Sequence, residues 1–227
     1  MITAATRLVA LLGHPVAHSL SPRMQNAAFA ARALDWAYVA LDVPPERLGE
    51  AVRGLAAAGF AGANVTAPHK LAVAALDDVD SDLASVNTLR FRDGRIEGHS
   101  TDAAVLKGLA TRRPVVIGDG GSAQAFAAAL PNVRVYSRRG EWPPQTAEAD
   151  LVVHATPVRD EVLFEPRAGQ TVVDLPYPAS ATASAAREAG ATVLDGLDVL
   201  VAQGAASFAI WTGLPAPVEV MSRAVAS

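Results

Sequence analysis

The chain has 227 residues, of which 51% are hydrophobic and 19% charged, and its formal net charge is -4 at pH 7. This composition indicates a globular protein, and the charge gives no reason to expect nucleic acid or an anionic membrane as a partner. Because cysteine is absent, disulfides, thiolate metal sites and cysteine nucleophiles are excluded, and a cytoplasmic location is expected. Of the five histidines only His14 and His18 are close in sequence, and no cysteine accompanies them, so we expect no metal.

The first half of the chain alternates between strands and helices, which is typical of parallel α/β sheets. Its first apolar run is too short for a membrane span and lacks the cleavage region of a signal peptide. The expected elements are strands at 8–12, 37–41 and 62–65 and helices at 21–34, 46–58 and about 69–76. Asp93-Gly94 then predicts a tight turn between a strand pair at 88–92 and 95–98.

The pattern restarts at Pro114 with a strand, a glycine turn, an alanine-rich helix and a second strand. Later elements are expected as strands at 151–155, 171–174 and 192–194 and helices at 179–189 and 197–211. Two α/β domains are therefore predicted, the first comprising residues 1–108 with 198–227 and the second residues 109–197. In this arrangement the C-terminal helix returns to the first domain.

The glycine turn of the second domain predicts a dinucleotide site. Gly118, Gly120, Gly121 and Ala123 directly follow the strand 115–117 and open a helix, where backbone N–H groups can approach a pyrophosphate. The alternative is a tight turn without a ligand. The next strand ends at Ser137-Arg138-Arg139, where an arginine suits the 2′-phosphate of NADP(H) and an NAD enzyme would usually have a carboxylate. A solvated basic loop is the alternative for these arginines.

Two features of this domain oppose strong nucleotide binding. Asp119 places a carboxylate within the glycine turn, close to the expected phosphates. Residues 140–146 (GEWPPQT) leave no room for the helix and strand that normally follow such an arginine, so the domain is expected to be shortened at that edge.

Three polar clusters lie in the first domain. They are His18 to Pro22, Asn64 to Lys70, and the pair of segments 85–88 and 100–102 that flank the strand pair. Ser21 is expected to be a helix N-cap, whereas Ser19 has no evident role in folding. Each cluster alone can be explained by turns and caps, and a single lysine is usually solvated. Together they suit a polyhydroxylated carboxylate and a proton transfer.

At these residues the chain resembles the shikimate dehydrogenases. The segments GHPVAHSLSP, GANVTAPHK, SVNTL, STD, GDGGSA and QGAASFAIWTG follow one another in the order found in that family, between Gly13 and Gly213. The resemblance implies an N-terminal α/β substrate domain, a Rossmann-type NADP domain and a cleft between them. It also implies that NADPH reduces 3-dehydroshikimate reversibly to shikimate, in the biosynthesis of aromatic amino acids, by a monomer or homodimer.

The resemblance also assigns roles to residues. Lys70 and Asp102 match the catalytic pair, with Lys70 as proton donor or electrostatic stabiliser. The substrate carboxylate would be held by Ser19, Ser21 and Tyr177, and the ring hydroxyls by Asn64, Thr66, Asn87, Asp102 and Gln203. The cofactor would be held by Gly118, Gly120, Gly121, Ser122, Ala123, Ser137, Arg138, Arg139, Thr156 and Gly196.

The chain departs from the family at Ser100, Asp119 and Ser137, where the family has Asn, Ala and Asn, and at His154, where it has Asn. It is also shorter. These departures concern cofactor affinity and the exact substrate more than the reaction. Quinate or an aminoshikimate is the nearest alternative substrate, although both serines and Tyr177 favour shikimate. An alternative from a different functional class is a non-catalytic protein that binds the substrate but has impaired NADP binding.

Overall fold

The computed structural model describes residues 2–226. The chain divides into two compact units, Met1–Thr101 with Val201–Ser227, and Asp102–Leu200. The boundaries expected from the sequence, at 108/109 and 197/198, lie a few residues from these. Among the described residues, no helix is both long and apolar enough to cross a membrane.

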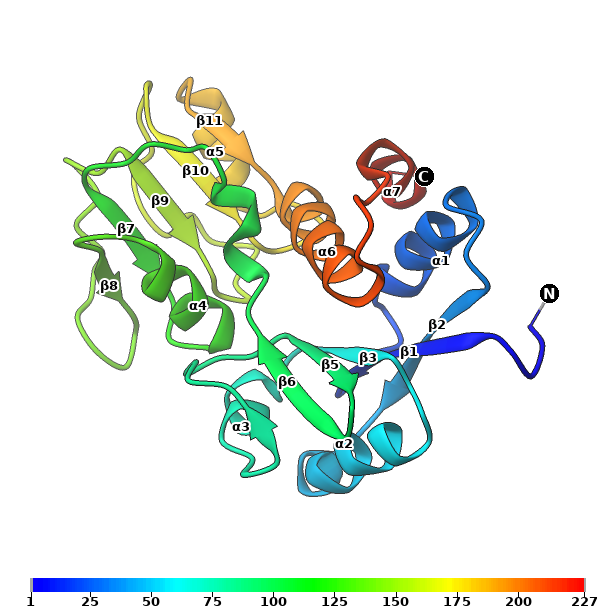
Figure 1. The fold of residues 1–227 in the computed structure, drawn as a ribbon. Coiled ribbons are helices and arrows are strands. Elements are labelled where there is room, and N and C mark those ends of the chain that lie inside the picture. Colours follow the sequence, from blue (N-terminus) through cyan, green and yellow to red (C-terminus); the bar gives the residue numbers. More distant parts are fainter. Residues whose placement is uncertain (1, 227) are drawn as a thin grey trace. The chain divides into compact units, whose positions relative to one another are not determined.

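The first unit is built on one mixed sheet. Its strands are β1 (Arg7–Gly13), β2 (Trp36–Asp42), β3 (Gly62–Val65), β4 (Val79–Asp80), β5 (Thr88–Arg92) and β6 (Arg95–His99). They lie in the order β2-β1-β3-β5-β6-β4 (Figure 1). β1 pairs in parallel with β2 and β3, but β5 is antiparallel to both β3 and β6. The tight turn is confirmed, since Asp93 and Gly94 both have positive φ, at 51° and 75°.

Helices cover this sheet. They are α1 (Ser21–Ala31), the 3₁₀ turn η1 (Pro45–Arg47), α2 (Leu48–Ala57), α3 (Lys70–Ala74), α7 (Val218–Val225) and the C-terminal part of α6 (Gly196–Thr212). Leu48, Val52 and Leu55 of α2 pack with Ala10 and Leu12 of β1 in one buried core. On α1, Phe29 stacks against Phe208 of α6 with the ring centroids 5.5 Å apart. The short strand β4 and helix α7 were not predicted from the sequence.

The second unit holds an all-parallel sheet. Its strands are β7 (Pro114–Ile117), β8 (Arg134–Tyr136), β9 (Leu151–His154), β10 (Thr171–Asp174) and β11 (Thr192–Leu194), and its helical segments include η2 (Asp102–Leu106), α4 (Gly121–Ala129) and α5 (Ala181–Glu188). The sheet order is β11-β10-β9-β7-β8, and every neighbouring pair is parallel. This is the Rossmann order without the strand that would lie beyond β8.

The edge at β8 is therefore open, as the short segment 140–146 predicts. Within the described chain, residues 137–150 connect β8 to β9 without a helix or strand. Val135 in the middle of β8 is 45% exposed, although its neighbour Tyr136 is fully buried. The missing neighbour leaves one side of the edge strand open to solvent.

Candidate functional site

Two of the three polar clusters meet at one end of the sheet of the first unit. Asn64 on β3 pairs with Thr88, the first residue of β5, and Thr88 in turn pairs with His99, the last residue of β6. Because β5 runs antiparallel to both neighbours, the residues that precede β5 and follow β6 come to the edge where β3 ends. The segments 85–88 and 100–102, which flank the strand pair, therefore lie at the same end of the sheet.

A buried hydrogen-bond network is centred on Asn64. Its amide oxygen accepts from the Tyr38 hydroxyl at 2.8 Å, and its amide nitrogen lies 3.1 Å from the Asn87 carbonyl oxygen. The same nitrogen lies 3.0 Å from the hydroxyls of both Thr88 and Ser207. Asn64 is 5% exposed, so this network fixes its side chain between the sheet and α6. Tyr38 and Ser207 were not identified from the sequence, and Thr88 was identified only as a member of the polar segment 85–88.

Asn87 extends the network toward α6. Its amide oxygen accepts from the backbone N–H of Thr101 at 2.7 Å, and its amide nitrogen donates to the Thr101 hydroxyl at 2.9 Å. The amide oxygen of Gln203 lies 3.5 Å from the same nitrogen. Three of the residues expected to hold ring hydroxyls, Asn64, Asn87 and Gln203, are thus brought together within one network.

Thr66 and Lys70 follow β3 in a single turn. The N–H of Thr66 donates to the carbonyl oxygen of Leu12 at 2.9 Å, and the carbonyl oxygen of Thr66 accepts from the N–H of His69 at 2.9 Å. Lys70 begins α3, and its carbonyl accepts from the N–H of Val86 at 3.0 Å. This bond ties the backbone of Lys70 to the residue beside Asn87. The structure therefore places Lys70 at the same edge as the amide network.

The entrance to α1 requires two corrections. Helix α1 begins at Ser21 itself, and its N-cap position is Leu20, so the expectation that Ser21 is the N-cap is wrong. Ser19 does have a local role, because its hydroxyl oxygen accepts from the N–H of Ser21 at 3.2 Å. This bond over two residues is a serine turn, which satisfies one N–H at the start of the helix.

In the second unit, the predicted strand, glycine turn and helix are present. Gly118 has φ at 137°, and an added Cβ would lie 2.5 Å from the carbonyl oxygen of Ala155, so this position requires glycine. Gly120 is the N-cap residue of α4, and a Cβ added there would meet only open space. The first turn of α4 thus begins at an open position, and the N-terminus of a helix suits an anion.

A cavity of about 180 Å³ lies beside this turn. It is lined by Gly118, Asp119, Ser137, Arg138, Arg139, Trp142, Thr156, Pro157, Val158 and Leu163. The structure thus brings five of the expected cofactor residues together at one cavity, whereas Gly120, Gly121, Ser122, Ala123 and Gly196 do not line it. Trp142 was not identified from the sequence, where its segment was noted only as short.

Both arginines at this cavity are paired with carboxylates. Arg138 forms an ion pair with Glu161, and its guanidinium carbon lies 5.4 Å from the ring centroid of Trp142. Arg139 lies 3.8 Å from the carboxylate of Asp119. All four charged side chains are at least 48% exposed, so these ion pairs are weak and exchangeable.

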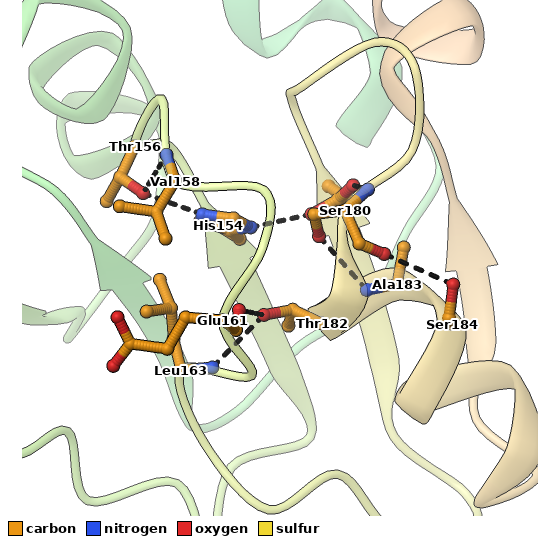
Figure 2. Close-up of polar contacts among 10 residues, drawn as sticks. His154, Thr156, Val158, Glu161, Leu163, Ser180, Thr182, Ala183 and Ser184 are labelled. Carbon is orange, nitrogen blue, oxygen red and sulfur yellow. Dashed lines mark hydrogen bonds and ion pairs between the residues drawn. The ribbon is translucent and has the colours of Figure 1, made fainter.

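Beneath the cavity, a chain of buried polar groups supports Thr156 (Figure 2). Nε2 of His154 lies 2.7 Å from the Thr156 hydroxyl, and Nδ1 lies 2.6 Å from a carboxylate oxygen of Asp174. The same carboxylate accepts from the hydroxyl and the N–H of Ser180, the N-cap of α5, at 2.7 and 3.1 Å. Burial raises the pKa of Asp174, but the hydrogen bonds from His154 and Ser180 outweigh burial and hold that pKa below its usual value.

The remaining expected residues lie in the second unit as well. Asp102 begins η2. A Cβ added to Gly196 would lie 2.4 Å from the carbonyl oxygen of Pro176, so a close backbone approach requires glycine beside the segment that carries Tyr177. The roles assigned to Lys70, Asp102 and Tyr177 remain predictions.

A larger cavity, of about 1000 Å³, lies elsewhere in the first unit. None of the expected site residues lines it. Its walls carry exposed charged groups that pair with each other, such as Arg53 with Asp78 at 2.9 Å.

Taken together, a parallel sheet in Rossmann order, a glycine turn before α4 and arginines after β8 define the second unit as a dinucleotide-binding domain. Residues 11–89 match the shikimate dehydrogenase substrate binding domain, and residues 196–226 match the shikimate 5'-dehydrogenase C-terminal domain. The chain belongs to the shikimate dehydrogenase family, which confirms the resemblance seen in its sequence.

Similar proteins support this membership along the whole chain. A shikimate dehydrogenase (NADP(+)) of Anaeromyxobacter dehalogenans is 43% identical, with 99% of this chain and 98% of the relative covered. The crystal structure of shikimate dehydrogenase from Aquifex aeolicus matches with a TM-score of 0.89 at 31% identity and covers both chains fully. That of the Thermus thermophilus enzyme with NADP(H) and shikimate gives 0.83 at 32% identity, covering 96% of this chain and 98% of the other.

The chain is shorter than the relative from Anaeromyxobacter dehalogenans. Its alignment with the Anaeromyxobacter dehalogenans protein spans 272 positions, so at least 45 of them have no residue among the 227 of this chain. The open edge at β8 is where the Rossmann order lacks a strand, and is therefore a place where the relatives can carry additional chain.

Proposed function

We propose that the protein is an NADP-dependent shikimate dehydrogenase that reduces 3-dehydroshikimate reversibly to shikimate. The observation that carries this proposal is the cavity beside Gly118, where Arg138, Arg139 and Thr156 meet, in a chain 43% identical to a shikimate dehydrogenase (NADP(+)). The proposal includes a cytoplasmic enzyme that acts as a monomer or homodimer.

The nucleotide unit fits NADP(H) in two respects. Gly120 leaves open space at the N-cap of α4, and the N–H groups in the first turn of this helix suit a pyrophosphate. Arg138 at the cavity presents a planar guanidinium, which suits the 2′-phosphate. Gly118, Gly120, Gly121, Ser122 and Ala123 would hold the pyrophosphate side, Ser137, Arg138, Arg139 and Thr156 the adenosine side, and Gly196 the nicotinamide side.

The first unit would hold most of the substrate. We assign the carboxylate to Ser19, Ser21 and Tyr177, and the ring hydroxyls to Asn64, Thr66, Asn87, Asp102 and Gln203. The hydrogen-bond network supports this assignment because it fixes the amides of Asn64 and Asn87 beside Gln203 before any ligand arrives. A rigid amide cluster suits a ring that carries several hydroxyls.

In the reduction, the C3 carbonyl carbon would accept a hydride, which is the chemistry that NADPH would supply when bound. The ammonium of Lys70 would donate a proton to the carbonyl oxygen or stabilise its developing negative charge. Asp102 would orient this ammonium and accept a hydrogen bond from the neighbouring ring hydroxyl. The short turn after β3 supports the role of Lys70, because it holds the lysine backbone beside the amide network.

The proposal is tested by steady-state kinetics with three alcohols, shikimate, quinate and an aminoshikimate, each with NADP⁺. We expect kcat/KM for shikimate to exceed that for the other two by roughly tenfold or more. Quinate adds a hydroxyl and an aminoshikimate replaces one with an amine, and either change leaves a buried polar group without a suitable partner. A preference for quinate or aminoshikimate would reassign the substrate. Shikimate binding without any turnover would instead support a non-catalytic binding protein.

A further inference from the structure

Arg138 has two partners in the structure, and they differ in kind. On one side the Glu161 carboxylate forms an ion pair with its guanidinium. On another, the indole ring of Trp142 lies 5.4 Å from the guanidinium carbon, within the range of a cation–π contact. Trp142 belongs to the short connection after β8 and lines the same cavity as Arg138.

We propose that Glu161 is a specificity-determining residue that limits the preference of the nucleotide site for NADPH over NADH. The proposal rests on the proposed function, since it assumes that this cavity receives the adenosine end of the cofactor. The Glu161 carboxylate competes with the 2′-phosphate of NADPH for Arg138. When NADH binds, the same carboxylate can accept a hydrogen bond from the ribose 2′-hydroxyl.

Glu161 is held beside the cavity by its backbone. The Thr182 hydroxyl donates to the Glu161 carbonyl at 3.2 Å and accepts from the N–H of Leu163 at 3.1 Å (Figure 2). Thr182 is fully buried near the start of α5, and Leu163, which is 6% exposed, lines the cavity itself. The segment that carries Glu161 is therefore anchored at the carbonyl of Glu161 itself and again two residues further along the chain, at Leu163.

The charge of Glu161 affects NADH and NADPH differently, because the two cofactors differ at the ribose 2′ position. A carboxylate is the group that NAD-binding Rossmann domains place near the ribose hydroxyls, and Glu161 supplies one from a different segment of the chain. A 2′-phosphate carries more charge than a carboxylate, so it can displace Glu161 from an exposed ion pair. The displaced carboxylate stays nearby, because its backbone is anchored, and repels the phosphate.

Trp142 provides a contact for Arg138 that does not depend on Glu161, so Glu161 can be mutated without releasing Arg138 from the cavity. If Glu161 is neutralised, the guanidinium of Arg138 retains its contact with the indole ring and remains at the cavity. Glu161→Gln preserves the size of the side chain and removes only its charge. Asp160→Asn is the matched control, because Asp160 is the exposed neighbouring residue and loses the same charge, while the ion pair to Arg138 stays intact.

The experiment is calorimetric titration of the wild type and both variants with NADPH and with NADH. For Glu161→Gln we expect NADPH to bind roughly threefold to tenfold more tightly and NADH to bind equally or more weakly, the scale of one exposed charge near a phosphate. Asp160→Asn should stay within about twofold of the wild type for both. The gain in NADPH affinity should shrink at high salt.

An unchanged ratio of the two affinities in Glu161→Gln, or an equal change in Asp160→Asn, would overturn the role of Glu161 and leave the proposed function standing. A wild-type protein that binds neither nucleotide would overturn the proposed function itself. The two failures are therefore distinguishable in one set of titrations.

Discussion

Nδ1 of His154 lies 2.6 Å from a carboxylate oxygen of Asp174, and neither side chain is exposed to solvent. The pair links the end of β9 to the N-cap of α5 through Ser180, and it reaches the cavity through Thr156. Since Asp174 accepts the Nδ1 proton, Nε2 of a neutral His154 is the acceptor that faces the Thr156 hydroxyl. A buried acid–imidazole pair thus positions a residue proposed to bind the cofactor.

Replacing Asp174 with Asn should lower the free energy of unfolding and should make that free energy less dependent on pH. The folded-state pKa of Asp174 lies below its usual value, so the carboxylate stabilises the fold above about pH 4 and loses this effect as the pH falls through the folded-state pKa. For Asp174→Asn we expect the free energy of unfolding at pH 7 to fall by about 1–3 kcal/mol.

Urea denaturation at several pH values between about 2 and 7 tests this expectation. The variant should lose less stability on acidification than the wild type. Asp160→Asn, at an exposed position, serves as the control. Identical acid dependence in the wild type and Asp174→Asn would show that this carboxylate contributes nothing to it.

Replacing Lys70 with Ala should affect turnover far more than binding. We expect kcat to fall by at least ~100-fold while substrate affinity stays within about tenfold, the usual scale for a lost acid or base. Lys107→Ala, at an exposed position, is the matched control and should retain turnover. Near wild-type kcat in Lys70→Ala would remove this residue from the mechanism.

Replacing Arg138 with Ala should weaken the use of NADPH. Loss of a charge-assisted contact to the 2′-phosphate is expected to raise the NADPH Michaelis constant roughly tenfold to hundredfold, with little change for NADH. Arg139→Ala should have a smaller effect, since Arg139 is 89% exposed and contacts Asp119 only at 3.8 Å. An NADPH Michaelis constant in Arg138→Ala within about twofold of the wild-type value would contradict the assignment of Arg138.

Replacing Asp119 with Ala should tighten NADPH binding. Its carboxylate lines the cavity beside the glycine turn, so its removal relieves repulsion of the phosphates by roughly threefold to thirtyfold in affinity. Arg139 neutralises part of this charge, which favours the lower end of the range. Shikimate affinity should not change. Calorimetry that shows unchanged or weaker NADPH binding in Asp119→Ala would exclude an unfavourable effect of this carboxylate.

Most of the fold could be predicted because its signals are local. The strand at Gly62–Val65, the Asp93-Gly94 turn and the glycine turn after β7 each depend on a few consecutive residues. Two elements had no such signal: β4 has two residues, and α7 follows a proline-rich segment near the end of the chain. Helix α1 ends at Ala31, short of the expected Leu34, and Ala33 then adopts a positive φ of 52°.

The site could be predicted less completely. The residues that were not predicted contact partners that are distant in the sequence. Ser207 bonds to Asn64 across 143 residues of sequence, and Glu161 pairs with Arg138 across 23. A serine within an apolar helix and a glutamate in a loop carry no distinctive pattern by themselves. Trp142 was visible in the sequence, but only the fold shows that the short connection brings its ring under Arg138.

We expect the second unit to bind NADP(H) although its sheet ends at β8 and lacks the strand that would follow. Titration of the wild-type protein with NADPH, followed by the fluorescence of the cofactor, tests this claim most directly. We predict saturable binding at one site per chain with a dissociation constant between about 1 μM and 1 mM, weakened by Arg138→Ala. Shikimate binding without any NADPH binding would contradict it, and would make a substrate-binding protein the better account.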